Sequence, residues 1–273
     1  MKKLLSLFFS IGLFFTGIET PFNNTCAMES IVNSNTKVSK PKVVAVVPIK
    51  MNNQRCPGKN TKSLSDGTPL IHCILKTLKQ VNNIDEIYVY CSNEDIKQYL
   101  IPGIKFLKRS EKLDSNTTSI NEVLSAFAND IDSDIYVLSH ATAPFIRSET
   151  IQDSICQVIG GLYDSALAVK KLNEFLWKDG KPLNYDPKNI PRTQDLETIY
   201  SETSGLYVFK KDLIKLENRR VGHNPYLKEV GKIEAVDIDD PEDFTIAGAV
   251  YDKVFKDMLC HTDHHMLKKN LEF

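Results

Sequence analysis

VVAVVPIKMNNQRCPGKN, residues Val43–Asn60, is the stretch that decides the fold. Its first five residues, Val43–Val47, are apolar, and the run ends abruptly at Pro48 before a polar loop. A short apolar run bounded by proline and glycine predicts a buried strand that leads into a loop. We therefore expect the first strand of a sheet here, with the polar loop at its carboxyl end.

The loop after this strand is basic. It carries Lys50, Arg55 and Lys59 close to Gly58. Glycine permits close approach of the backbone to a ligand, while lysine and arginine supply positive charge and directed donors. The loop therefore indicates a site for a polyanion, most simply a nucleoside triphosphate. The alternative is a solvated basic loop, which is the commoner role of an isolated cluster of this kind.

The composition is that of an ordinary globular protein. Of the 273 residues, 42% are apolar and 25% are charged, and the formal net charge is −1. This length accommodates one large domain, or one domain with a sizeable insertion. The near-neutral charge gives no broad basic surface of the kind that binds nucleic acid. We therefore expect no nucleic-acid partner, and any polyanion site must be local.

The N-terminal segment has the pattern of a secretory signal. Lys2 and Lys3 precede an apolar run, Leu4–Ile18, which is short for a membrane span. We assign residues 1–41 to this apolar segment and a polar linker. One interpretation is export or membrane tethering, with membrane contact only if the segment is retained. The other is that translation starts at Met28, which would leave a cytoplasmic enzyme with a short polar lead. Both starts stay open at this stage, and we predict a cytoplasmic location.

Predicted strands and helices alternate along the rest of the chain. The strand patterns cover Val43–Val47, Ile87–Cys91, Ile104–Leu107, Ile135–Leu138, Ser165–Lys170, Gly205–Phe209 and Lys232–Asp237. The helix patterns cover Leu70–Gln80, Asn93–Tyr99, Ser119–Phe127, Ser148–Leu162 and a last segment that opens at Pro241. This alternation is typical of a mostly parallel sheet covered by helices on both faces. We predict a three-layer α/β domain at residues 42–259 and a polar tail at residues 260–273.

The alternation breaks at about residues 173–202. Apolar residues flank the pair Asp179-Gly180, and such a pair between apolar runs is a strong signal for a tight hairpin turn. Prolines and polar residues follow. We interpret the segment as a small excursion from the sheet that is available as a subunit contact or a lid.

Polar groups follow four of the predicted strands. They lie in the basic loop, at Lys108-Arg109, at Ser139–Thr142 and at Asp237–Asp240. Ligands of open α/β sheets bind at the carboxyl ends of the strands, so the fold should bring these groups to one crevice. Within the third group, we expect His140 to be a substrate contact and not a catalyst.

The acidic group contains two carboxylates that are one residue apart. Asp237 and Asp239 can both reach a hard cation if the backbone turns there, and Mg²⁺ typically takes one or two carboxylates together with phosphate oxygens. The alternative is that acidic residues before Pro241 cap the C-terminal helix. We assign capping to Asp240 and Mg²⁺ binding to Asp237 and Asp239.

The order of these motifs resembles the acylneuraminate cytidylyltransferases, the CMP-sialic acid synthetase group, together with the related CMP-Kdo synthetases. The resemblance extends over about residues 42–256. The matching segments are Pro48-Ile49-Lys50, Asn53-Gln54-Arg55, Pro57-Gly58-Lys59-Asn60, Asp66–Ile71, Arg109 with Ser119-Ile120, His140–Pro144, Arg192–Asp195, Ser204–Tyr207 and Val236–Asp239. Four departures from the family pattern are visible. Lys50 replaces an arginine, and His140 replaces a glutamine. The step Asn53-Gln54-Arg55 lacks the glycine and the lysine of the family's Gly-Ser-Lys-Arg step, and Glu202 stands where sialate-specific members often carry an arginine.

The resemblance implies a Rossmann-like sheet of the nucleotide-diphospho-sugar transferase type. It implies transfer of CMP from CTP to the anomeric hydroxyl of an acidic 2-keto sugar, such as a sialic acid, with release of pyrophosphate. The implied CTP-binding residues are Lys50, Arg55, Lys59, Asn60, Arg109 and Ser119, and the implied sugar-binding residues are His140, Thr142 and Arg192. The implied catalytic residues are Lys59, Asp237 and Asp239, with Mg²⁺ held by the two aspartates. The excursion matches the dimerisation element of the family, which implies a homodimer.

Two alternative functions stay open at this stage. One is another nucleotidyltransferase of the same fold, which would use a different base or an alcohol acceptor. The other is a non-catalytic relative that binds a nucleotide or a sugar. The altered basic loop and the N-terminal apolar run favour this second alternative.

Overall fold

The computed structural model describes residues 39–254, and the elements and contacts given below belong to this part of the chain. The chain divides into two units, residues 1–35 and residues 36–273, and the described residues all belong to the second unit. The N-terminal apolar segment and the polar tail, residues 260–273, therefore lie outside the described residues. Within the described range, no helix is both long enough and apolar enough to cross a membrane.

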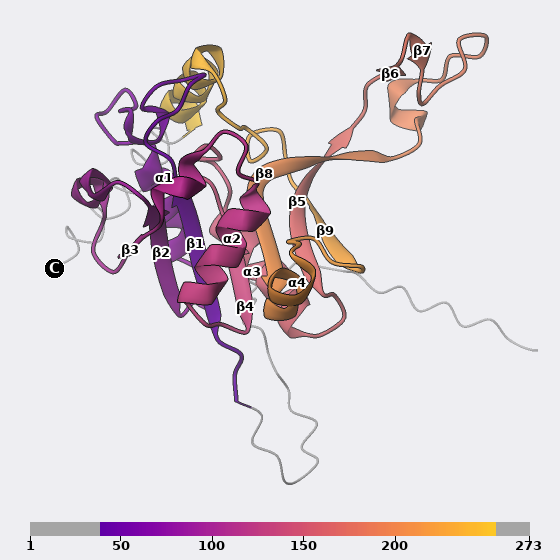
Figure 1. Ribbon diagram of the computed structural model, residues 1–273. Coiled ribbons are helices and arrows are strands. Elements are labelled where there is room, and N and C mark those ends of the chain that lie inside the picture. Colours follow the sequence, from indigo (N-terminus) through magenta and orange to yellow (C-terminus); the bar gives the residue numbers. More distant parts are fainter. Residues whose placement is uncertain (1–38, 255–273) are drawn as a thin grey trace, which may run out of the picture. The chain divides into compact units, whose positions relative to one another are not determined.

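Seven strands form one sheet at the centre of the fold (Figure 1). They are β1 (Val43–Ile49), β2 (Glu86–Cys91), β3 (Lys105–Lys108), β4 (Ile135–Leu138), β5 (Ser165–Leu172), β8 (Ile199–Lys210) and β9 (Pro225–Glu229). Their order is β3-β2-β1-β4-β8-β5-β9. Only β8 is antiparallel to its neighbours in this sheet. The carboxyl ends of the other strands consequently meet at one edge, as predicted for a mostly parallel α/β sheet.

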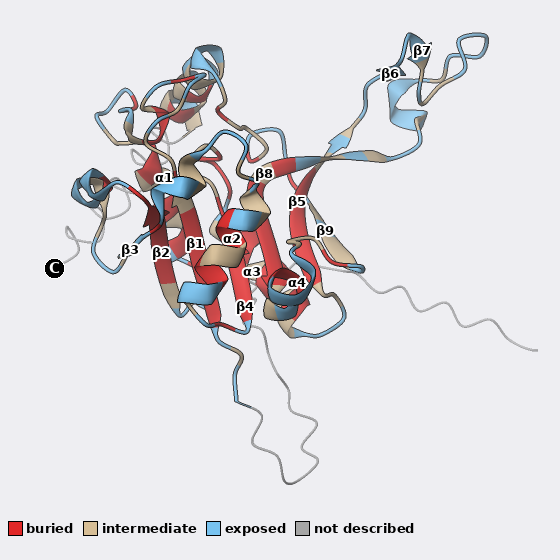
Figure 2. Cartoon of the chain, viewed as in Figure 1, coloured by how far each residue is buried: buried red, intermediate tan, exposed pale blue. Residues whose placement is uncertain are grey.

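Helices cover both faces of the sheet. Helices α1 (Ile71–Lys79) and α3 (Ser148–Ile159) pack on one face, and α2 (Ile120–Asp130) and α4 (Lys211–Glu217) pack on the other. The side chains of β1 alternate between the two clusters: Val43, Ala45, Val47 and Ile49 face α1 and α3, whereas Val44 and Val46 face α2. Because both faces are covered, β1 reads as a continuous apolar run, and Figure 2 shows it with its neighbours β2 and β4 as the buried centre of the fold.

The excursion from the sheet contains the predicted hairpin. Strands β6 (Trp177–Lys178) and β7 (Lys181–Pro182) pair with each other and project beyond the main sheet (Figure 1). The turn residues Asp179 and Gly180 both have positive φ, at 51° and 74°. This backbone suits a two-residue turn between twisted strands, which explains the strength of the Asp-Gly signal. The excursion is shorter than predicted, because residues 199–202 already belong to β8.

The prediction of a last strand at Lys232–Asp237 is wrong. Residues 232–235 form turns, with Ala235 N donating to Gly231 O at 3.0 Å and Val236 N donating to Ile233 O at 3.2 Å. The reason is Glu234, whose buried carboxylate accepts a hydrogen bond from Thr150 Oγ1 at 2.8 Å. The sheet instead ends with β9, which the sequence pattern did not reveal. The helix that opens at Pro241 is confirmed and covers residues 241–254 of the described chain.

Candidate active site

Three loops meet at the carboxyl edge of the sheet, and two hydrogen bonds join them. Ile238 N donates to Thr142 O at 2.9 Å, which ties the acidic segment to the loop after β4. Lys59 Nζ donates to Ile238 O at 2.5 Å, which ties the basic loop to the same acidic segment. The convergence that the strand ends predicted is therefore present for these three groups.

The basic loop turns its central lysine inward. Gly58 has φ 67°, a conformation that glycine adopts without strain, and it caps the short 3₁₀ helix η1 (Lys59–Thr61). Lys59 is consequently only 8% exposed, whereas Arg55 remains largely exposed at the rim. Lys59 Nζ lies 3.3 Å and Arg55 Nη2 lies 2.7 Å from the same oxygen, Asp239 Oδ1. Two cations of the loop thus face one of the predicted metal-binding carboxylates.

Asp237 differs from Asp239 in its surroundings. Its Oδ1 atom is buried and has no hydrogen-bond partner within residues 39–254. A buried oxygen without a partner is costly unless a ligand satisfies it, and a carboxylate oxygen suits a hard cation such as Mg²⁺. In the same part of the chain, no cluster of three or more His, Cys, Asp or Glu side chains could hold a metal alone. The buried, unpartnered Oδ1 of Asp237 is the observation that fits a hard cation here.

Asp240 caps the last helix, as the sequence predicted. Its Oδ1 accepts hydrogen bonds from Glu242 N and Asp243 N at 2.9 and 3.0 Å. In return, Asp243 Oδ2 accepts hydrogen bonds from Asp239 N and Asp240 N at 2.9 and 3.0 Å. These amides lower the pKa of Asp243 below its usual value. Sequence reasoning missed Asp243, although an acid three residues after a helix cap is a recognisable signal.

Arg109 directly follows β3, at the carboxyl edge of the sheet. Its guanidinium is buried and donates from Nε and Nη2 to Asp114 Oδ1 at 3.2 and 2.6 Å. Ser92 Oγ donates to the other oxygen of Asp114 at 2.5 Å. Asp114 thus neutralises and orients Arg109, and sequence reasoning did not identify this partner.

The other residues predicted to bind CTP lie in two places. Lys50 Nζ donates to Asn116 Oδ1 at 2.7 Å, which joins the loop to the segment before α2. Asn60 Nδ2 donates to Lys50 O at 3.1 Å, which stabilises the loop from within. Ser119 begins α2 and forms a capping box with Glu122: Ser119 N donates to Glu122 Oε2 at 2.6 Å, and Glu122 N donates to Ser119 Oγ at 3.3 Å. A contact between CTP and the Ser119 hydroxyl stays a prediction.

His140 stands at the end of β4, partly buried beside the acidic segment. Burial of the ring lowers its pKa to about 4; the charge of Asp237 opposes this shift, and the positive charges of Arg220 and Lys59 add to it. The imidazole is therefore neutral at physiological pH and can donate or accept one hydrogen bond at each nitrogen. Arg220 was not among the residues that sequence reasoning identified.

Arg192 is not brought together with His140 and Thr142. It lies on the excursion, its side chain is 73% exposed, and Nε donates to Asp195 Oδ2 at 2.7 Å. Its predicted contact with the sugar stays a prediction.

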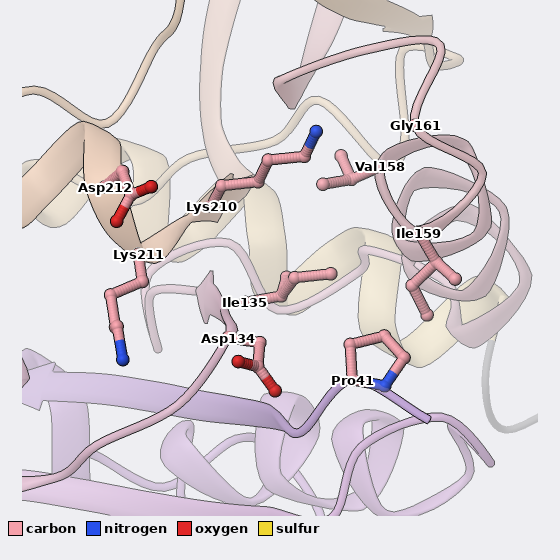
Figure 3. A pocket seen from close by; sticks show the side chains of 9 residues that line it. All are labelled: Pro41, Asp134, Ile135, Val158, Ile159, Gly161, Lys210, Lys211 and Asp212. Carbon is pink, nitrogen blue, oxygen red and sulfur yellow. The ribbon is translucent and has the colours of Figure 1, made fainter. Parts of the chain in front are cut away.

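A cavity of about 380 Å³ lies at the opposite edge of the sheet, where β4 begins and β8 ends. Figure 3 shows its lining side chains, with Lys210 extended toward Val158. The lining residues are Pro41, Asp134, Ile135, Val158, Ile159, Gly161, Lys210, Lys211 and Asp212. None of them belongs to the predicted site, so this cavity is separate from the three converging loops.

The fold and the converging loops define an α/β protein that gathers basic and acidic groups at the carboxyl edge of its sheet. A family model described as "Cytidylyltransferase" matches residues 44–262. Because the match spans most of the sequence, this chain belongs to the cytidylyltransferase family, a family of nucleotidyltransferase enzymes. The resemblance drawn from the motifs is confirmed.

Curated relatives share part of this sequence. The chain is 27% identical over 201 residues to N-acylneuraminate cytidylyltransferase A of Danio rerio, covering 70% of this chain and 46% of that protein. It is 25% identical over 212 residues to N-acylneuraminate cytidylyltransferase of Oncorhynchus mykiss, covering 73% and 49%. A shorter match, 32% over 123 residues, is to CMP-N,N'-diacetyllegionaminic acid synthase of Legionella pneumophila, covering 42% and 52%. The chain spans about half the length of these relatives.

Solved structures of low sequence identity share the fold. CMP:2-keto-3-deoxy-manno-octonic acid synthetase in complex with CTP has a TM-score of 0.61 at 18% identity, with 78% of this chain and 99% of that chain covered. The 4-diphosphocytidyl-2C-methyl-D-erythritol synthase of Anaerococcus prevotii has a TM-score of 0.59 at 14% identity, with 81% and 100% covered. The three-layer, mostly parallel fold class is thereby confirmed.

Proposed function

We propose that the protein transfers CMP from CTP to the anomeric hydroxyl of an acidic 2-keto sugar and releases pyrophosphate, with residues 42–259 as the catalytic domain. The observation that carries this proposal is the meeting of Lys59 and Arg55 at Asp239, two residues from the buried, unpartnered Oδ1 of Asp237, in a chain of the cytidylyltransferase family. Cations that face acidic metal ligands are what a nucleotide triphosphate needs at its phosphates.

The cations of the basic loop bind and orient the triphosphate. Arg55 and Lys59 hold Asp239 in the described structure, and phosphate oxygens would compete for the same donors when CTP binds. Lys50 extends this positive surface, and Asn60 fixes the loop through the carbonyl of Lys50. Positioning and charge neutralisation account for most of the catalysis of phosphoryl transfer, so these side chains would act without covalent chemistry.

Asp237 and Asp239 would hold Mg²⁺. The buried, unpartnered Oδ1 of Asp237 supports this assignment. When bound, the ion supplies positive charge at the α-phosphate and favours ionisation of the sugar hydroxyl. The hydrogen bonds from Asp239 N and Asp240 N to Asp243 hold the backbone of the two aspartates in register with the last helix.

The base and the acceptor would lie on either side of the phosphates. Arg109 and Ser119 belong to the part of the edge formed by β2, β3 and α2, and we assign them to the cytidine. His140 and Thr142 follow β4, and we assign them to the sugar. The low pKa of His140 keeps its ring neutral, so that its role is to hydrogen-bond a sugar hydroxyl and not to neutralise a charge.

A homodimer is also part of the proposal. The excursion exposes large apolar side chains, with Trp177 61% exposed and with Leu183 and Ile190 similarly open. Exposed apolar groups that lie together on a projecting hairpin favour association with a partner. Arg192 lies on the same excursion, so dimerisation would carry it toward the sugar site of the second copy. The variant pair Trp177→Ser and Leu183→Ser should convert a dimer to a monomer in sedimentation experiments; a full-length protein that is already monomeric contradicts this part.

The test of the reaction is an assay of pyrophosphate release with Mg²⁺, CTP and a panel of acidic 2-keto sugars. Both the full chain and the chain from Met28 should be assayed, and UTP and ATP should replace CTP in parallel. We expect release with CTP and at least one acid sugar, and little with the other nucleotides. Folded protein that releases no pyrophosphate with any of the sugars would contradict the proposal.

Since CTP is a cytosolic nucleotide, we further propose a cytoplasmic location.

A further inference from the structure

An arginine stacks on a buried tyrosine beside the proposed sugar site. The guanidinium carbon of Arg220 lies 4.0 Å from the ring centroid of Tyr207, and the Arg220 side chain is 22% exposed. Stacking on an aromatic face fixes the plane of a guanidinium while its edge keeps donors for another partner. Arg220 is therefore held in one orientation and still reachable from solvent.

The strand register places this pair close to His140. Tyr207 pairs with Leu138 across β4 and β8, and Leu138 is two residues before His140 in the chain. Leu138 and Tyr207 both belong to the apolar cluster beneath α2 and α4. The segment that carries Arg220 is tied to the first turn of α2, since Asn121 Nδ2 donates to Asn218 O at 2.9 Å. Arg220 thus lies on the face covered by α2 and α4, near the carboxyl edge where the loops converge.

The neighbouring acid does not satisfy the arginine. Glu202 Oε2 accepts a hydrogen bond from Tyr207 Oη at 2.8 Å, whereas it is 4.0 Å from Arg220 Nη2, which is longer than a hydrogen bond. Burial raises the pKa of Tyr207 to about 12, so its hydroxyl stays protonated and keeps donating to Glu202. Glu202 therefore orients the tyrosine, and the guanidinium retains donors for a second anion.

Arg220 lies close enough to His140 for its charge to act on the ring, as do the charges of Asp237 and Lys59. Lys59 and Asp237 are assigned to the triphosphate and its metal, whereas His140 is assigned to the sugar. Arg220 is therefore the cation near His140 that has no other assigned role. An acceptor that carries a carboxylate next to its reacting hydroxyl needs a cation in this place.

We infer that Arg220 binds the carboxylate of the acceptor and thereby selects acid sugars, an inference that rests on the proposed function. A guanidinium matches a carboxylate with two parallel N–H···O bonds, which a lysine cannot reproduce. Glu202 cannot take this role, because a carboxylate repels another. Arg220 supplies, from a distant loop, a positive charge beside the position of Glu202.

The test is an equilibrium binding measurement on the full chain, with CDP and Mg²⁺ present, so that it does not depend on turnover. The probes are N-acetylneuraminate and 2-keto-3-deoxy-manno-octonic acid, each compared with its methyl ester. We expect wild type to bind at least one acid roughly 10- to 100-fold more tightly than its ester, the range for hydrogen bonds to charged groups. Arg220→Gln should remove this preference without changing affinity for the ester, and Arg220→Lys should restore part of it.

The controls separate this inference from the proposed function. Lys215→Gln removes a positive charge from α4, where Lys215 pairs with Asp132 at the surface, and should retain the full preference for the acid. Affinity for CDP should be the same in all variants. The inference is overturned if wild type does not prefer the acids, or if Arg220→Gln weakens acid and ester equally. Pyrophosphate release is measured separately: a preference for the acid without turnover would support Arg220 and contradict the proposed reaction.

Discussion

Arg55 donates a hydrogen bond to Asp239 at 2.7 Å across 184 positions of sequence. The pair joins the loop after the first strand to the segment before the last helix. The Arg55 side chain is 70% exposed and the Asp239 side chain 44%, and ion pairs open to solvent contribute only about 0–1 kcal/mol to stability. The pair therefore contributes little to holding the fold together. Its significance is positional: it holds a cation that we propose to bind phosphate next to a carboxylate that we propose to bind Mg²⁺.

Lys59 should be the most sensitive cation of the basic loop. Its ammonium group is nearly buried and points at the acidic segment, so no other charge can replace it. We expect Lys59→Met to lower the rate of pyrophosphate release by about 100-fold or more, the usual effect of removing a preorganised donor for transition-state charge. The measurement is the initial rate at saturating CTP, with folding checked by circular dichroism.

Lys62 is the matched control for this variant. It lies three residues further on, is exposed, and sits 4.3 Å over the ring of Phe244 instead of facing the site. Lys62→Met should retain most of the activity. An equal loss of activity in the two variants would contradict this prediction. It would mean that only the net positive charge of the loop matters, and not the position of the Lys59 ammonium group.

The two acidic roles can be separated by matched substitutions. Asp237→Asn should raise the Mg²⁺ concentration for half-maximal rate by about tenfold or more, because a neutral amide is a poorer ligand for a hard cation. Asp240→Asn should leave that concentration unchanged, because asparagine caps a helix as well as aspartate does. A titration of activity with Mg²⁺ measures both, and direct binding of Mn²⁺ provides a readout without turnover. A shift of similar size in Asp240→Asn would contradict our division of roles.

Local signals in the sequence account for the frame of the fold. The buried run of β1 was visible because both of its faces are covered, and the hairpin turn was visible because Asp179 and Gly180 both need positive φ. The strand ends carry their polar residues at fixed places after each apolar run. Parallel topology then brings Lys59 and Thr142 to one edge, whereas Asp237 reaches it beside the hydrogen bond from Ile238 N to Thr142 O and not as a strand end.

What the sequence did not reveal depends on contacts between distant segments. Residues 232–237 have the composition of a strand, but Glu234 is drawn into the interior by Thr150 and by the backbone amide of Arg147. No sequence pattern marked Arg220 as a site residue. Its position depends on the hydrogen bond between Asn121 and Asn218 and on its stacking against the ring of Tyr207. Neither effect leaves a periodic pattern near the residue concerned.

The role of Ser119 is open to a direct test. Its hydroxyl donates to Glu122 Oε2 at 2.8 Å and accepts from Glu122 N at 3.3 Å, so capping already occupies it. Ser119→Ala should lower the free energy of unfolding by about 1 kcal/mol, the typical value for a helix cap. If CTP also contacts the hydroxyl, as the family resemblance implies, KM for CTP should rise; an unchanged KM restricts Ser119 to capping. Ser110→Ala is the control, because Ser110 caps a short 3₁₀ helix through Lys112 N at 3.3 Å.

His140 should make the stability of the fold depend on pH. Its pKa in the folded protein is about 4, below the ordinary value of 6.5, so the unfolded chain binds more protons between these two pH values. Stability is therefore complete above pH 6.5 and is lost as the pH falls toward 4. Between pH 7 and pH 5 the loss attributable to His140 should be about 2 kcal/mol, measured by urea unfolding. His140→Gln should reduce the difference in unfolding free energy between pH 7 and pH 5 by this amount, because glutamine does not titrate.

NMR titration of the His140 ring resonances offers an independent check. A midpoint near 6.5 in the folded protein would contradict the neutral imidazole, on which the assignment of this residue to the sugar depends.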